Sequence, residues 1–159
     1  MELLLLYVFL TLSLSFLCSI LEAVLLSINT TFIKIKLKEG KSYANKLLNL
    51  KKSIDEPLII ILTLNTIAHT VGAILVGVQA KVAYSELNYE NTFFASGISD
   101  ELLVGFVSSV MTILILLFSE IIPKTIGAKY SNSLAQFTSI FLSSIIPVFK
   151  YSGVLWVLQ

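Results

Sequence analysis

The sequence contains no arginine, so all 11 of its basic residues are lysines. Arginine is the side chain that best holds a phosphate through two parallel hydrogen bonds, and its absence argues against nucleic acid as a partner. Charged residues make up only 13% of the chain, about half of the roughly 25% that is usual in soluble domains. Together with a mean hydropathy of +0.90, this composition predicts a single all-α membrane domain.

Cysteine and histidine are equally scarce, with one residue of each. Cys18 lies inside an apolar run, where it cannot form an internal disulfide and is expected to be a small buried side chain. A lone histidine, His69, is more often a hydrogen-bonded packing residue than a metal ligand. Enzymes need a nucleophile with a base or a metal-activating cluster, so this scarcity argues that the chain is not an enzyme.

Long apolar runs predict helices that cross a membrane, because about 20 apolar residues span a bilayer. The first run is longer than the core of a signal peptide and has no basic residues before it, which favours a permanent span. The last segment, 131–159, has an apolar face interrupted by Pro147 and Lys150, and it could cross the membrane or lie on its inner leaflet. We predict spans at 3–28, 58–80 and 102–122.

The lysines are concentrated in one connecting segment, 29–56, whereas the segment 81–101 is mainly acidic. Lysine-rich short loops stay in the cytoplasm, so we expect the N-terminus outside the cell and the first loop inside. Either an amphipathic helix along the inner membrane face or a solvated loop would fit 29–56. Asp55 and Glu56 directly before Pro57 are typical of a helix start.

A carboxylate, Glu120, lies near the end of the third apolar run. Carrying such a group to mid-bilayer costs about 2.5–3.5 kcal/mol, so it indicates a functional site. Pro123 has no N–H to donate, which leaves the carbonyl of Ser119 without its usual helical partner. A carboxylate beside a bare carbonyl could hold a hard cation. We expect Pro123 to end or break the helix and Gly127 to allow the turn that follows.

Polar residues also mark one face of each of the other two spans. Ser15, Ser19 and Glu22 share a face of the first span. Small hydroxyl residues commonly allow close helix packing, but the Glu22 carboxylate needs a partner. Asn65 lies within the second span with Thr66 beside its polar face. A cation could satisfy Asn65, and so could a neighbouring helix.

The residues Ser119-Glu120-Ile121-Ile122-Pro123-Lys124-Thr125-Ile126-Gly127 resemble the end of the third helix in the DUF21 transmembrane domain of the CNNM/CorC family of magnesium transport proteins. Ser19-Ile20-Leu21-Glu22-Ala23 and Leu64-Asn65-Thr66 resemble the same family in the first and second helices. The resemblance covers essentially the whole chain. It departs from the family pattern at Ser119, where glycine is usual.

This resemblance implies a homodimer of three-span subunits in the lipid bilayer, with short amphipathic helices on the cytoplasmic side. On that ground we place 131–159 on the inner leaflet and the C-terminus in the cytoplasm. It also implies a bound Mg²⁺ and magnesium efflux coupled to Na⁺. The alternative is a membrane-embedded Mg²⁺ sensor or scaffold that does not transport. CBS domains are expected in a full-length protein, but nothing in these residues resembles them.

An ion shell built only from oxygen atoms suits Mg²⁺ or Ca²⁺ rather than zinc or copper. Glu22 and Thr66 are assigned to outer contacts of the ion or to a site for the coupling ion. The predicted shell comprises the Glu120 carboxylate, the Ser119 carbonyl, the Asn65 side-chain oxygen and the Ser19 hydroxyl, with Ser15 as a further member.

Overall fold

A computed structural model of the chain describes residues 2–88, 113 and 116–151, and every element in these ranges is a helix. The predicted all-α class is therefore confirmed for this part of the chain. Most of the predicted third span, 102–122, lies outside the described residues. The helices are α1 (Glu2–Ser27), α2 (Thr30–Lys38), α3 (Ser42–Lys52), α4 (Asp55–Asn88), the π-helical segment η2 (Leu117–Ile121), α6 (Ile122–Lys129) and α7 (Ser131–Tyr151).

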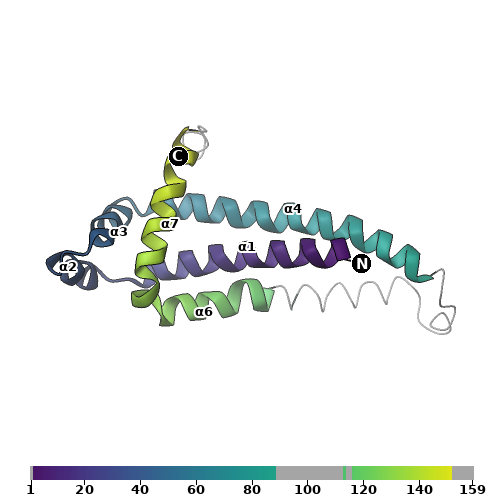
Figure 1. Cartoon of the computed structure of the whole chain (residues 1–159), viewed down its shortest axis with the longest axis horizontal. Coiled ribbons are helices and arrows are strands. Elements are labelled where there is room, and N and C mark those ends of the chain that lie inside the picture. Colours follow the sequence, from purple (N-terminus) through teal and green to yellow (C-terminus); the bar gives the residue numbers. More distant parts are fainter. Residues whose placement is uncertain (1, 89–112, 114–115, 152–159) are drawn as a thin grey trace.

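The two longest helices, α1 and α4, lie side by side (Figure 1). Their close approach depends on Gly72, because a Cβ atom added there would lie 2.8 Å from the Cβ atom of Thr11. The helix α4 begins at Asp55, as the acidic start predicts, but it runs on to Asn88. The helix therefore continues past residue 80, where the predicted span ends, since no glycine or proline interrupts 81–88.

The lysine-rich segment folds as two short helices rather than as a solvated loop. The Asn29 side chain caps α2 by accepting a hydrogen bond of 2.7 Å from the backbone N–H of Phe32. Gly40, with a positive φ of 72°, lies between α2 and α3. Ile33 of α2 and Leu47 of α3 are fully buried in one cluster. These helices are therefore amphipathic, with the apolar face turned to the protein.

The core lies around the C-terminal half of α1. Leu21 and Leu25 of this helix pack in one buried cluster with residues of α3, α4 and α7. Val24 and Ile28 pack in a second cluster with residues of α2, α3 and α7. Burying a large aliphatic side chain contributes about 1.5–3 kcal/mol, so these clusters hold the short helices against α1.

Helix α7 runs across α1 and α4 at the end where α2 and α3 lie (Figure 1). By length and composition, α1 over Leu5–Ser27 and α7 could each cross a membrane. The pair formed by α3 and the first part of α4 could do so as a third span, but it is bent by 87°. The described helices are those of a membrane protein.

Candidate metal centre

The helix that carries Glu120 does not end at Pro123. The backbone N–H of Ile122 bonds to the carbonyl of Leu117, five residues back, and this π-helical turn passes directly into α6. Pro123 then occupies the first turn of α6, where its missing N–H is tolerated. The proline thus changes the hydrogen-bonding pattern without ending the helix. Single π-helical turns of this kind are frequent at functional sites.

The carbonyl of Ser119 faces α1. It accepts a hydrogen bond of 2.8 Å from the Ser19 hydroxyl, and both residues are fully buried. Pro123 cannot donate an N–H to this carbonyl, which is why the oxygen is free to bond outside its own helix. The structure therefore brings together two of the predicted ligands, which are 100 residues apart in the sequence.

Gly127 does not form a turn, and the prediction of one there is wrong. It lies inside α6 and is buried against α1. A Cβ atom added at this position would lie 2.9 Å from the carbonyl oxygen of Ile20 and 2.9 Å from the Cβ atom of Ala23. The residue is needed for close helix approach, and this approach holds η2 and α6 against α1.

A second polar contact forms one helical turn away on α1. The buried Ser15 hydroxyl donates to Oδ1 of Asn65 at 2.8 Å and lies 3.0 Å from Nε2 of His69. A hydroxyl has a single hydrogen, so in this arrangement His69 donates from Nε2 to the Ser15 oxygen. This contact agrees with the prediction that His69 is a hydrogen-bonded packing residue. Its spacing of four residues from Asn65 puts both side chains on the face of α4 that meets Ser15.

One buried hydroxyl at this place has no partner. Oγ of Ser119 is inaccessible to solvent and makes no hydrogen bond with any described residue. Leaving such a group unsatisfied costs about 1–3 kcal/mol, so this hydroxyl is available to hydrogen-bond or coordinate a further group. Ser15 joins α1 to Asn65 of α4, and Ser19, one turn further along α1, joins it to the Ser119 carbonyl of η2. Hydroxyl, amide and carbonyl oxygens such as these are the ligands that a hard cation such as Mg²⁺ prefers.

The carboxylates of Glu22 and Glu120 meet at one ammonium group. The Nζ atom of Lys124 lies 3.2 Å from Oε2 of Glu22 and 3.2 Å from Oε1 of Glu120. Glu22 thereby has the partner that the sequence required. The exposed fractions of 16% for Glu22 and 38% for Glu120 place the cluster at the edge of the buried site. With two acids and one base, this cluster carries a net negative charge.

Lys124 was missed as a site residue, although its spacing of four residues from Glu120 was visible in the sequence. Thr66, in contrast, is predicted to lie near the ion, but the structure does not place its side chain beside the other site residues. Its side chain is exposed and its hydroxyl bonds to the carbonyl of Leu62 in the same helix. Among residues 2–88, 113 and 116–151, no group of three or more His, Cys, Asp or Glu side chains could hold a metal ion.

Replacing Pro123 with alanine should weaken cation binding. The new N–H would be able to bond to the Ser119 carbonyl within the helix, in competition with α1 and with a cation. We expect an apparent Kd for Mg²⁺ about 10-fold higher, as for the loss of a supporting contact in a metal site. Isothermal titration of purified protein with MgCl₂ measures this, and an unchanged Kd would contradict the role assigned to the freed carbonyl.

The fold is that of a helical membrane domain in which polar side chains of α1 bond to α4 and to η2. Residues 5–159 match the family model described as the cyclin M transmembrane N-terminal domain (CNNM). The chain belongs to this family.

A UPF0053 protein of Synechocystis sp. is 26% identical to it over 152 residues. That alignment covers 96% of this chain but only 39% of the relative, so the chain spans well under half of that protein's length. No solved structure gives a significant match.

Proposed function

We propose that this chain forms the membrane-embedded ion pathway of a Mg²⁺ transporter that carries out magnesium efflux coupled to Na⁺. One observation carries the proposal, namely that serine hydroxyls one turn apart on α1 bond to the Asn65 side chain of α4 and to the Ser119 carbonyl of η2, where the Ser119 hydroxyl has no partner among the described residues. Membership of the CNNM family supports the same function. Ionisable and polar groups within membrane segments commonly mark ion pathways.

In this proposal the cation replaces hydrogen bonds that the ligands make to one another. The Ser19 hydroxyl would turn its hydrogen away from the Ser119 carbonyl, so that both oxygens face the ion. The Ser15 hydroxyl and Asn65 Oδ1 would do the same one helical turn away. Mg²⁺ surrenders its waters reluctantly, and an ion held partly through waters can leave again, as transport requires.

Lys124 would act as a tethered counter-ion at the edge of the site. Its ammonium group neutralises part of the charge of Glu22 and Glu120 when no metal is bound. A divalent ion offers a stronger attraction to both carboxylates. Its arrival would displace the flexible lysine, and the returning lysine would help to release the ion.

The proposed topology follows from the lysines and from the arrangement of the helices. The lysine-rich helices α2 and α3 lie at one end of α1, which supports a cytoplasmic position for that end and an N-terminus outside. Helix α7, running across α1 and α4, would then lie along the inner leaflet with the C-terminus in the cytoplasm. We further propose that two copies pair in the bilayer and that CBS domains accompany this domain in the full-length protein.

Flux measurements in proteoliposomes test this function. Purified protein reconstituted with a Mg²⁺-sensitive dye inside the vesicles should move Mg²⁺ down its gradient, and an opposing Na⁺ gradient should accelerate it. Empty liposomes provide the background. Mg²⁺ binding without flux, under both Na⁺ conditions, would instead identify a membrane-embedded sensor or scaffold, and the absence of binding would contradict both functions.

Replacing Lys124 with glutamine should tighten Mg²⁺ binding. Removing the competing ammonium leaves two carboxylates available to the metal, so we expect the apparent Kd to fall by about 10-fold, the equivalent of 1.4 kcal/mol. Isothermal titration of the purified variant measures it. Lys129→Gln, which removes an exposed lysine from the end of the same helix, is the matched control. A Kd that rises would show that Lys124 supports binding rather than competing with it.

A further inference from the structure

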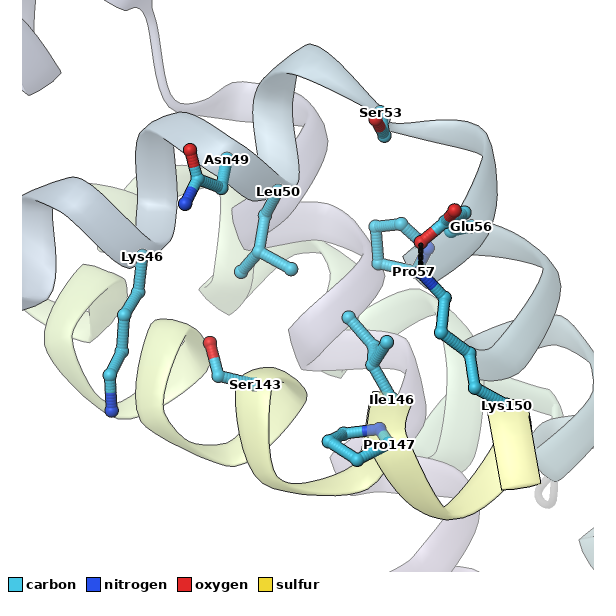
Figure 2. Close-up of a pocket in the computed structure, with 10 residues that line it drawn as sticks. All are labelled: Lys46, Asn49, Leu50, Ser53, Glu56, Pro57, Ser143, Ile146, Pro147 and Lys150. Atoms are coloured by element: carbon cyan, nitrogen blue, oxygen red, sulfur yellow. Dashed lines mark ion pairs between the residues drawn. The ribbon is translucent and has the colours of Figure 1, made fainter.

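A separate pocket lies on the membrane domain away from the candidate metal centre. It has a volume of about 330 Å³ and lies between α3, the start of α4 and α7 (Figure 2). This volume is at the lower end of the range, about 300–1,000 Å³, that binds small molecules or their fragments. The bend of 87° between α3 and α4 leaves this space beside α7.

The charges at the pocket favour an anion. Lys46 of α3 and Lys150 of α7 stand at opposite ends of it in Figure 2. The ammonium of Lys150 lies 2.9 Å from Oε2 of Glu56, so this carboxylate is already neutralised. The ammonium of Lys46 makes no ion pair with any described residue. The lining therefore carries one net positive charge. The Glu56 carboxylate is paired with Lys150 and does not repel an anion as a free carboxylate would.

The pocket also offers hydrogen-bond donors that no described residue uses. The side chains of Asn49, Ser53 and Ser143 line it, and none of them bonds to another residue of the described ranges. An amide group and two hydroxyls can all donate to phosphate oxygens. Lysine binds phosphate as a point charge, so the lack of arginine in the chain does not oppose such a ligand.

The remaining wall of the pocket is apolar, and this favours a lipid headgroup over a freely soluble anion as the ligand. Leu50 and Ile146 lie between the two lysines, with Pro57 and Pro147 beside them (Figure 2). Helix α7 crosses α1 and α4 at the end where α2 and α3 lie. In the topology proposed above, the pocket therefore lies at the level where these helices leave the bilayer. Basic pockets between helices at this level suit anionic headgroups, whose acyl chains need apolar surroundings.

We propose that this pocket binds the phosphate-bearing headgroup of an anionic phospholipid. The phosphate lies between Lys46 and Lys150 and receives hydrogen bonds from Asn49 and Ser143. The glycerol backbone and the first acyl carbons lie against Ile146. A lipid held there would join α3, α4 and α7, and would fix the bend between α3 and α4 independently of Mg²⁺.

Native mass spectrometry of the purified protein tests the proposal. Protein in detergent is titrated with phosphatidylglycerol or with phosphatidylcholine, and the bound fraction gives an apparent Kd for each lipid. The phosphatidylglycerol Kd should be lower than that of phosphatidylcholine. K46Q should raise the phosphatidylglycerol Kd by about 10-fold, because the hydrogen bond between the Lys46 ammonium and the lipid phosphate is lost. Lys46 is exposed, so this variant should fold normally.

The control K52Q removes an exposed lysine from the same helix without touching the pocket. It should leave the Kd within about twofold of the unmodified protein. Equal losses in K46Q and K52Q would show general attraction to a lysine-rich surface and would overturn the proposal. So would equal Kd values for the two lipids. In a parallel arm, inorganic phosphate in phosphatidylcholine micelles should not raise the thermal unfolding midpoint. A rise that K46Q removes would assign the pocket to a soluble anion instead.

Discussion

Replacing Glu120 with glutamine is expected to reduce Mg²⁺ flux in proteoliposomes by about 100-fold, the upper range for loss of a contact that supports a bound metal. Glutamine keeps the shape of the side chain but removes the negative charge that draws a divalent ion to this end of the site. Lys124 would remain paired with Glu22, 3.2 Å away, so the fold should persist. The measurement compares initial rates at equal protein density in the vesicles.

The matched control is Glu39→Gln. Glu39 also pairs with a lysine, Lys36, at 2.7 Å, but on the exposed surface of the short helix α2. Such surface ion pairs contribute about 0–1 kcal/mol, so this variant should transport at the normal rate. Normal flux in Glu120→Gln would exclude Glu120 from the pathway. Equal loss in both variants would point to reconstitution rather than to the site.

Replacing Gly127 with alanine is expected to damage both stability and ion binding. The added Cβ atom would lie 2.9 Å from the backbone oxygen of Ile20, and a backbone atom cannot move aside as a side chain can. Overpacking of this kind costs about 1–3 kcal/mol. Because α6 must shift away from α1, the hydrogen bond between Ser19 and the Ser119 carbonyl should lengthen. We expect a lower thermal unfolding midpoint in detergent and weaker Mg²⁺ binding.

Ala128→Leu provides the comparison for this variant. It adds a larger volume to the next position of α6, which is exposed rather than turned toward α1. It should leave the unfolding midpoint and the Kd for Mg²⁺ nearly unchanged. If Gly127→Ala is as stable as the unmodified protein and binds Mg²⁺ normally, then close approach of α6 to α1 does not position the site.

The sequence predicted the elements of this fold better than the contacts between them. Apolar runs predicted helices at α1 and α4, because a segment that crosses a bilayer must satisfy its backbone hydrogen bonds within a continuous helix. The pattern of lysines and apolar residues left two possibilities for 29–56, and the structure shows helices there. Helix α4 continues to Asn88, past the predicted span end at 80, because a more polar sequence does not by itself end a helix.

For the candidate site, too, the sequence predicted which residues take part better than it predicted which of them are in contact. Ser15, Ser19, Asn65, Ser119 and Glu120 were chosen because polar groups in apolar helices need partners, and this rule depends only on residue type and spacing. The structure joins Ser15 to Asn65 and Ser19 to Ser119. Glu120 meets Lys124 instead, and Thr66 faces away from the others.

The sequence by itself determined that this is an all-helical membrane domain with polar, oxygen-bearing side chains on its helices, because hydropathy and local spacing act within single segments. Only the tertiary structure decided that Lys124 bridges Glu22 and Glu120 and that Gly127 packs against α1. Glu22 and Lys124 are 102 residues apart. Whether such residues meet depends on how each helix is rotated about its axis and shifted along it relative to its neighbour. The close packing of many side chains determines both the rotation and the shift.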